Sequence, residues 1–171
     1  MDKSRLPKFR YHPNVYENGI VEFSEGVCDC CHKKTEAYVQ VMYCVEDVEC
    51  ICMDCVASGE AAKKFDGTFI QDAEEIDNPE AEEELLHRTP GYVSWQGENW
   101  LACCNDYCAY LGTVGTKELE ELGIADDLFE KDGSFDGYQN ARAHLTKDGS
   151  FNGHLFRCLH CGKYKLYTEA D

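Results

Sequence analysis

The sequence Cys158-Leu159-His160-Cys161-Gly162 decides how the rest of the chain can be interpreted. It contains two thiols separated by two residues, and a glycine follows them. The glycine lets the backbone fold beneath the thiols, because glycine adopts conformations that other residues avoid. Two thiols held in this way form half of a tetrahedral metal site. We refer to such a short cysteine pair as a hook.

Three more hooks precede this one. Cys28-Asp29-Cys30-Cys31 and Cys52-Met53-Asp54-Cys55 together give the pattern C-x2-C-x20-C-x2-C, which falls within the spacing of zinc sites. The third, Cys104-Asn105-Asp106-Tyr107-Cys108, is one residue wider and has no partner before Cys158. The sequence therefore predicts two Zn²⁺ sites with four thiolate ligands each: Cys28, Cys31, Cys52 and Cys55 at the first site, and Cys104, Cys108, Cys158 and Cys161 at the second.

The ligand assignment leaves alternatives. Four cysteines lie outside the two predicted sites: Cys30, Cys44, Cys50 and Cys103. Cys30 and Cys50 stand next to hooks and could exchange with a neighbouring thiolate. His32 and His160 could replace a thiolate, because imidazole nitrogen is also a common ligand of Zn²⁺.

Twelve cysteines in 171 residues could instead form a disulfide framework, so the compartment matters. The first residues of the chain show no apolar run typical of a signal peptide, and no later stretch is long and apolar enough to span a bilayer. We therefore expect a soluble, cytoplasmic protein. Thiols stay reduced in the cytosol, which favours metal ions over disulfides.

The chain carries a formal net charge of −17. A zinc ion held by four thiolates makes the protein still more negative, because the ion neutralises only half of the thiolate charge. Direct binding to nucleic acid is disfavoured, since phosphate binding depends on cationic side chains. A basic protein partner is favoured instead, although acidic residues can also serve solubility alone.

Much of the acid lies between Asp72 and Glu84. Inside this run, Asn78-Pro79 is typical of a helix start, with Asn78 as the N-cap and proline in the first turn. We expect the helix to end before Thr89-Pro90-Gly91. A run of charge is usually a solvated helix face, and the functional alternative is an acidic docking surface.

The sequence predicts an α+β fold, with small antiparallel hairpins and sheets of zinc-ribbon type, several short helices, and two zinc sites that staple them together. Residues 38–43 have the β-branched and aromatic content of a strand. Apolar residues on both sides of the last hook predict a hairpin with the hook at its tip, which is the zinc-ribbon arrangement. A helix is expected after Cys52, interrupted at Gly59.

Three units are expected along the chain. Residues 1–72 form an N-terminal arm and the first zinc-hook module, residues 73–87 an acidic linker or helix, and residues 88–171 a second zinc-ribbon module with a helical insertion. These units can pack as one compact domain. Residues 88–100 contain both tryptophans, and aromatic residues this dense around turns more often pack a core or a metal site than bind a ligand.

All-sulfur sites leave no open coordination position for water, so both predicted zinc ions are structural. The sequence contains no glycine-rich phosphate loop, no H-E-x-x-H motif and no G-x-S-x-G motif. We expect that the protein is not an enzyme. A cysteine-dependent enzyme that uses one of the spare thiols is the alternative.

Taken together, these motifs resemble the CbrC family of bacterial proteins. The matching residues are Leu6-Pro7-Lys8-Phe9-Arg10-Tyr11-His12-Pro13, Cys28-x2-Cys31, Cys52-x2-Cys55, Gly59-Glu60-Ala61-Ala62, Arg88-Thr89-Pro90-Gly91-Tyr92, Trp95-Gln96, Cys104-x3-Cys108 and Phe156-Arg157-Cys158-x2-Cys161-Gly162. The family often has cysteine-proline in the second hook, where this chain has Cys52-Met53. This departure leaves the predicted ligands intact.

The resemblance implies a zinc-binding protein linked to tolerance of a nuclease colicin. Together with the acidic charge, it suggests an immunity or tolerance factor that binds and neutralises a basic nuclease toxin, without direct contact to nucleic acid or a membrane. Attraction between opposite charges would speed such an encounter. The alternative is a zinc-ribbon adaptor of the transcription or translation machinery, in which the ribbon contacts protein.

Overall fold

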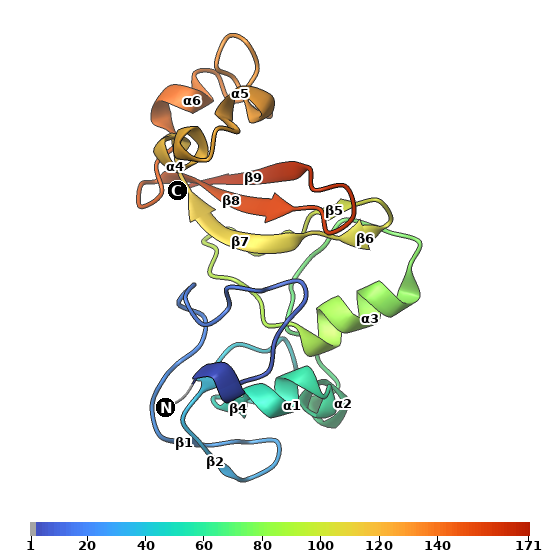
Figure 1. Ribbon diagram of the computed structural model, residues 1–171. Coiled ribbons are helices and arrows are strands. Elements are labelled where there is room, and N and C mark those ends of the chain that lie inside the picture. The colour runs from blue at the N-terminus through green and yellow to red at the C-terminus, as the bar shows by residue number, and fades with distance from the viewer. Residues whose placement is uncertain (1–2) are drawn as a thin grey trace.

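A computed structural model describes residues 3–171 and arranges them as a small α+β protein (Figure 1). The N-terminal half contains the 3-10 helix η1 (Lys3–Arg5), β1 (Gly26–Val27), β2 (Lys34–Thr35), β3 (Tyr38–Val39), β4 (Ile51–Cys52), α1 (Met53–Ala57), α2 (Glu60–Phe65) and α3 (Pro79–Arg88). The C-terminal half contains β5 (Ala102–Cys103), β6 (Asp106–Tyr107), β7 (Ala109–Val114), α4 (Thr116–Glu121), α5 (Ala125–Leu128), α6 (Ala141–His144), β8 (Phe151–Arg157) and β9 (Tyr164–Ala170).

The strands form short antiparallel sheets, which confirms the predicted class. β1 pairs with β2, β3 with β4 and β5 with β6, while the largest sheet has the order β7-β8-β9. The strand predicted over residues 38–43 is shorter than expected and ends at Val39. Tyr43 leaves that direction because its N–H and C=O groups exchange hydrogen bonds with Thr68, at 2.7 and 3.0 Å.

The longest paired segment is the hairpin of β8 and β9. Its register runs from Phe151 opposite Ala170 to Arg157 opposite Tyr164, so residues 158–163 form the loop at its tip. The hairpin therefore carries the last cysteine hook where the sequence pattern placed it. β7 pairs along the other edge of β8 and completes a sheet that lies across the middle of the molecule (Figure 1).

Two of the helices show how local sequence sets their limits. α3 begins where Asn78 accepts a hydrogen bond from the Ala81 N–H at 3.2 Å, with Pro79 as its first residue, and it ends before Thr89, as predicted. α1 and α2 are separated at Gly59, whose φ of 75° favours glycine. Among residues 3–171, every helix is too short or too polar for a membrane crossing.

Buried apolar residues form three clusters. The first surrounds α1 and α2, and the third joins α4, α5 and α6 to the sheet. The second lies between them and is aromatic: Tyr11, Tyr92, Trp100, Tyr110 and Phe156 are all at most 2% exposed. The ring of Tyr92 stacks on that of Tyr110 with centroids 4.3 Å apart. This aromatic cluster is where the two halves of the chain meet.

The N-terminal arm crosses this cluster. The Tyr11 carbonyl accepts a hydrogen bond from the Tyr110 N–H at 2.7 Å, so the arm is anchored to β7. His12 is fully buried, and its Nδ1 lies 3.0 Å from the Pro90 carbonyl oxygen. Burial lowers the pKa of His12 to about 4, so its imidazole is neutral at physiological pH. The arm thus lies across the aromatic cluster.

The aromatic cluster should dominate the stability of the fold. We expect Phe156→Ala to lower the free energy of unfolding by about 3–5 kcal/mol, because Phe156 is fully buried and its removal leaves a cavity. The matched control is Leu122→Ala at a side chain that is 54% exposed, with an expected change within about 0.5 kcal/mol. Urea unfolding followed by circular dichroism measures both. Equal effects of the two substitutions would contradict this role.

Candidate metal centres

The structure brings together the four cysteines predicted at the first site. The sulfurs of Cys28, Cys31, Cys52 and Cys55 all lie within 4.8 Å of one another, a spacing that a single metal ion can bridge. Three of the four residues are buried and Cys31 is partly buried. Cys52 closes β4 and directly precedes α1, which carries Cys55. These four cysteines, which we call the first sulfur cluster, could therefore hold a metal ion inside the N-terminal half.

One hook in each half folds in the same way. The Cys28 N–H donates to the Lys33 carbonyl at 3.0 Å, and the Cys158 N–H donates to the Lys163 carbonyl at 2.8 Å. In both hooks the residue after the second cysteine has a positive φ, 58° at His32 and 73° at Gly162. His32 therefore adopts the conformation that the glycine was expected to provide in the last hook.

Backbone N–H groups point at the first sulfur of each of these hooks. The Cys52 N–H donates to Cys28 Sγ at 3.3 Å, while the N–H groups of His160 and Cys161 donate to Cys158 Sγ at 3.4 and 3.5 Å. Such donors stabilise a negatively charged sulfur, which is the form that binds metal. The two hooks are thus built to hold thiolates.

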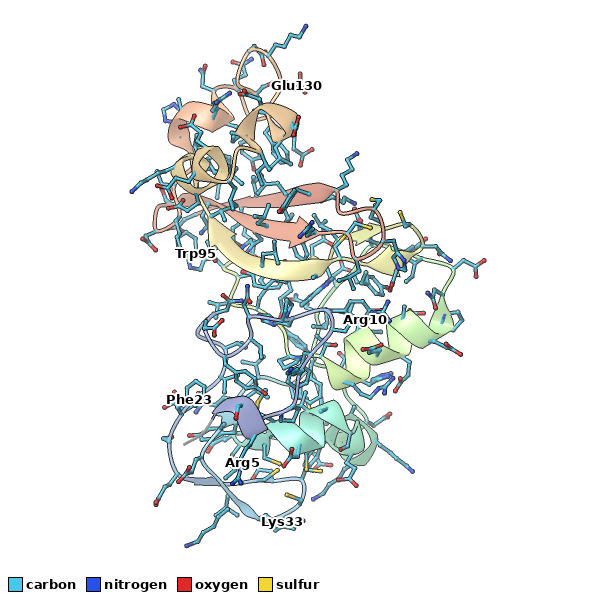
Figure 2. All side chains as sticks on the ribbon, viewed as in Figure 1. Arg5, Arg10, Phe23, Lys33, Trp95 and Glu130 are labelled. Carbon is cyan, nitrogen blue, oxygen red and sulfur yellow. The ribbon has the colours of Figure 1, made fainter. Side chains whose placement is uncertain are left out.

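The second group of four sulfurs, which we call the second sulfur cluster, lies on the C-terminal half, at one end of the β7-β8-β9 sheet. It contains the sulfurs of Cys103, Cys104, Cys158 and Cys161, which lie within 4.8 Å of one another. The sulfur of Cys103 is 3.7 Å from that of Cys104 and 3.7 Å from that of Cys161. This cluster is more exposed than the first, because only Cys158 is buried. Figure 2 shows the sulfur atoms of the molecule in yellow, on the ribbon of Figure 1.

One member of the second cluster differs from the sequence prediction: Cys103 takes the place that the prediction gave to Cys108. Cys104 and Asn105 both have positive φ, 56° and 55°, and form a tight turn between β5 and β6. This turn presents the two adjacent thiols at its start. The chain then passes through β6 before it reaches Cys108, which lies outside the group of four sulfurs but still interacts electrostatically with Cys158 and Cys161.

Cys108 is instead part of the aromatic cluster. Its side chain is 0% exposed, its N–H donates to the Leu101 carbonyl at 3.0 Å, and its own carbonyl accepts from Trp100 Nε1 at 2.9 Å. Burial raises the pKa of the Cys108 thiol to about 12. A sequence signal for the tight turn exists in Asn105, because asparagine tolerates the left-handed conformation that such turns require.

The thiols of the sulfur clusters have different pKa values: some lie below the usual range and others above it. Burial raises the pKa of Cys158, but the backbone N–H donors and neighbouring thiols outweigh it and bring the pKa down to about 6. The pKa of Cys28 is lowered by the same kind of donor against the effect of burial. Burial raises the pKa of Cys52 to about 12. A bound cation would lower the pKa of every thiol that coordinates it.

The residues left as alternatives lie outside both groups of four sulfurs. His160 directs its Nε2 to Asp106 Oδ2 at 2.7 Å, and His32 Nε2 lies 3.4 Å from Lys64 Nζ. Cys30 and Cys50 lie beside the first cluster, where each interacts electrostatically with Cys28. Cys44, which also lies outside both groups, has its sulfur 3.2 Å from the Glu46 carbonyl oxygen. The His160 imidazole is thus held by Asp106, whereas the exposed His32 lies beside Lys64.

Asp106 is a supporting residue that the sequence reasoning missed. Its carboxylate is buried, accepts a hydrogen bond from the Tyr11 hydroxyl at 2.6 Å and pairs with the guanidinium of Arg10. It also contacts His160, between the two cysteines of the last hook. Burial raises the pKa of Asp106, but the hydrogen bonds from Tyr11 and His160 lower it by more than burial raises it. The pKa of Asp106 therefore lies below its usual range. Asp106 therefore ties the N-terminal arm to the last hook.

Comparison with known proteins assigns the chain to a family. The model of an uncharacterised protein family, UPF0167, matches residues 6–170. The chain belongs to the UPF0167 family. It is 36% identical over 175 residues to UPF0167 proteins of Mycobacterium bovis and Mycobacterium tuberculosis, covering 96% of this chain and 94% of each relative. A UPF0167 protein of Pseudomonas aeruginosa is 36% identical over 168 residues, covering 92% of this chain and 93% of the relative. No solved structure matches this chain.

The composition of the second cluster can be tested in this UPF0167 protein by two single substitutions. We expect Cys103→Ala to remove about one bound metal ion per chain, because a site with three thiols binds more weakly. Cys108→Ala should leave the metal content unchanged and serves as the matched control. Elemental analysis of the purified variants measures the ratio. Loss of metal in the Cys108 variant alone would restore the sequence prediction.

Proposed function

We propose that this UPF0167 protein is a non-enzymatic, cytoplasmic, zinc-stapled protein whose acidic surface binds a basic protein partner. The observation that carries the proposal is the joint presence of two four-thiol clusters and a strip of acidic side chains that lack cationic partners. The clusters would supply a rigid scaffold, and the unpaired acidic side chains of residues 75–82 would supply a region of negative charge. Each part can be tested separately.

Zinc is the ion that suits both clusters. Four thiolates in a compact group favour Zn²⁺ in tetrahedral geometry. The first cluster combines two hooks of the usual C-x2-C spacing, whereas the second combines one such hook with the adjacent pair Cys103-Cys104. The β8–β9 hairpin with Cys158 and Cys161 at its tip supports a zinc-ribbon interpretation of the C-terminal half. Four sulfur ligands would fill the coordination shell, so the ions would stabilise the fold rather than activate water.

Metal analysis tests this part of the proposal. Protein purified without added metal should contain about two Zn²⁺ ions per chain, one for each cluster. Removal of zinc by a chelator should unfold the protein, because metal binding at structural sites contributes directly to folding. Circular dichroism before and after chelation, with zinc restored as the control, measures the change. A folded, zinc-free protein would contradict the structural role.

The acidic strip lies along α3 and the segment before it. Glu75, Asp77, Glu80 and Glu82 are exposed, and none of them forms an ion pair with another residue of the described range 3–171. Their neighbours are neutralised: Glu83 pairs with Arg88, Glu84 with Arg10 and Glu74 with Lys165. The unpaired carboxylates therefore present free negative charge to solvent. We call these four residues the acidic strip.

A basic nuclease domain is the partner that we put first. The net charge of −17 would repel nucleic acid and attract a domain that itself binds nucleic acid through cationic side chains. The resemblance to the CbrC family, with its link to a nuclease colicin, supports the same choice. By covering the phosphate-binding surface of the nuclease, the acidic strip would keep nucleic acid out.

An adaptor of the transcription or translation machinery is the second candidate. It is favoured by Leu159, which is 43% exposed in the loop of the β8–β9 hairpin. An apolar side chain at the tip of a ribbon can contact another protein. In this case the partner would be a ribosomal or polymerase subunit, and the tip would be the contact.

A pull-down from the native cell, at low and at high salt, tests the acidic surface. We expect a basic nuclease or toxin domain that is released at high salt, because salt screens the attraction between exposed charges. Neutralising the acidic strip should weaken its capture about tenfold or more: Glu75→Gln, Asp77→Asn, Glu80→Gln and Glu82→Gln.

The matched control removes four charges from exposed sites in the C-terminal half instead: Asp127→Asn, Glu130→Gln, Asp136→Asn and Asp148→Asn. It should retain the partner, since these sites lie outside the strip. Equal losses in both variants would mean that net charge alone matters. Recovery of ribosome or polymerase subunits that survives high salt would favour the adaptor.

A further inference from the structure

A pocket of about 410 Å³ lies between residues 92–98 and the segment that contains Val41 and Tyr43. Ile20 and Gln71 complete its lining. It is separate from both sulfur clusters and from the acidic strip, none of whose residues line it. Neither the metal sites nor the proposed docking surface accounts for this pocket.

Four large apolar or aromatic side chains stand exposed on the rim of the pocket, beside polar ones. Trp95 is 55% exposed, Val93 54%, Val41 46% and Tyr43 39%, and all four line the pocket. Figure 2 labels Trp95 near β7, on the side of the N-terminal half. Large apolar side chains gathered on one exposed rim mark a binding site more often than scattered ones do. The rim can therefore cover the apolar part of a ligand.

The pocket also contains a buried carboxylate. Glu98 is 5% exposed, and its Oε2 accepts hydrogen bonds from the Tyr43 hydroxyl at 2.7 Å and from the Gln71 N–H at 3.3 Å. The backbone N–H groups of Tyr92 and of Glu98 itself also stabilise the carboxylate. All of these donors are neutral, and no ion pair within the described part of the chain includes Glu98. A buried carboxylate without a cation is costly. Burial accordingly raises the pKa of Glu98.

We propose that this pocket binds the guanidinium or ammonium head of a basic side chain, with the head near Glu98 and Tyr43 and the apolar stem against Trp95. Aromatic faces attract cations, and a carboxylate within a partly desolvated pocket adds a charge-assisted hydrogen bond. The cation would come from a lysine or arginine of the basic partner, and this choice of source rests on the proposed function.

Other ligand classes fit the pocket less well. A neutral apolar ligand could cover the exposed rim, but it would bring no cation to the buried Glu98 carboxylate. An anion would be repelled by Glu98 and by the net charge of the chain. A cation with an apolar stem is the class that satisfies both the rim and the buried carboxylate.

Saturation-transfer NMR with three small amides tests the inference on the full chain. The probes are N-acetyl-arginine amide, N-acetyl-lysine amide and the uncharged N-acetyl-norleucine amide. We expect at least one of the two basic amides to bind with a Kd on the order of 1 mM, as is typical of ligands of this size. The uncharged amide should bind about 10- to 100-fold more weakly, because it lacks the charge-assisted hydrogen bond.

Two variants place the signal in the pocket. Glu98→Gln keeps the shape of the side chain and should weaken the basic amide about 10- to 100-fold. Trp95→Ala changes an exposed residue, so it should fold normally and still weaken binding. Glu130→Gln removes the same charge at a distant exposed site, labelled in Figure 2, and should bind as the wild type does.

The inference fails if the uncharged amide binds as well as the basic ones, or if neither Trp95→Ala nor Glu98→Gln changes binding. Its failure is distinguishable from that of the proposed function. A basic protein captured through the acidic strip, together with no binding of either basic amide to the pocket, would overturn this inference alone. Binding of a basic amide without capture of any basic protein would overturn the proposed function alone.

Discussion

The structure depends on one constraint that occurs twice: four cysteine sulfurs must come close to one another. Cys103 and Cys161 are 58 positions apart in the chain, yet their sulfurs lie 3.7 Å apart. Such a contact requires both the β5–β6 turn and the β8–β9 hairpin to be formed. A metal ion would offset the entropy lost in closing so long a loop and in ordering strands as short as β5 and β6.

The second sulfur cluster adjoins the aromatic cluster. Cys108 and Phe156 belong to it, and each stands within a few residues of a cysteine in the second cluster. Asp106 connects the same region to Tyr11 and Arg10 of the arm. The metal centre, the arm and the aromatic core are therefore one structure. Residues 92–98 connect this region to the surface, because Tyr92 is buried in the aromatic cluster while Val93 and Trp95 are exposed.

Asn78-Pro79 and Thr89-Pro90 were sufficient to predict the limits of α3, and the apolar residues beside the last hook were sufficient to predict its hairpin. The spacing of the cysteines was sufficient to predict one complete cluster. It was not sufficient at Cys103. There the outcome depends on a two-residue turn at Cys104 and Asn105, which moves Cys108 into the core. The roles of Asp106 and Glu98 depend on contacts between distant segments. Asp106 lies inside the third hook, but the hook pattern does not indicate which residues it contacts. Such contacts become visible only once the fold is known.

The most direct measurement of the central claim is X-ray absorption at the zinc edge of the protein as purified. We predict a first shell of four sulfur atoms per zinc at about 2.3 Å, averaged over two equivalent all-thiolate sites. Nitrogen or oxygen at about 2.0–2.1 Å in that shell would contradict the account, because it would mean that an imidazole or a water takes the place of a thiolate. It would also reopen the question of catalysis, since a site with a bound water is the kind that enzymes use.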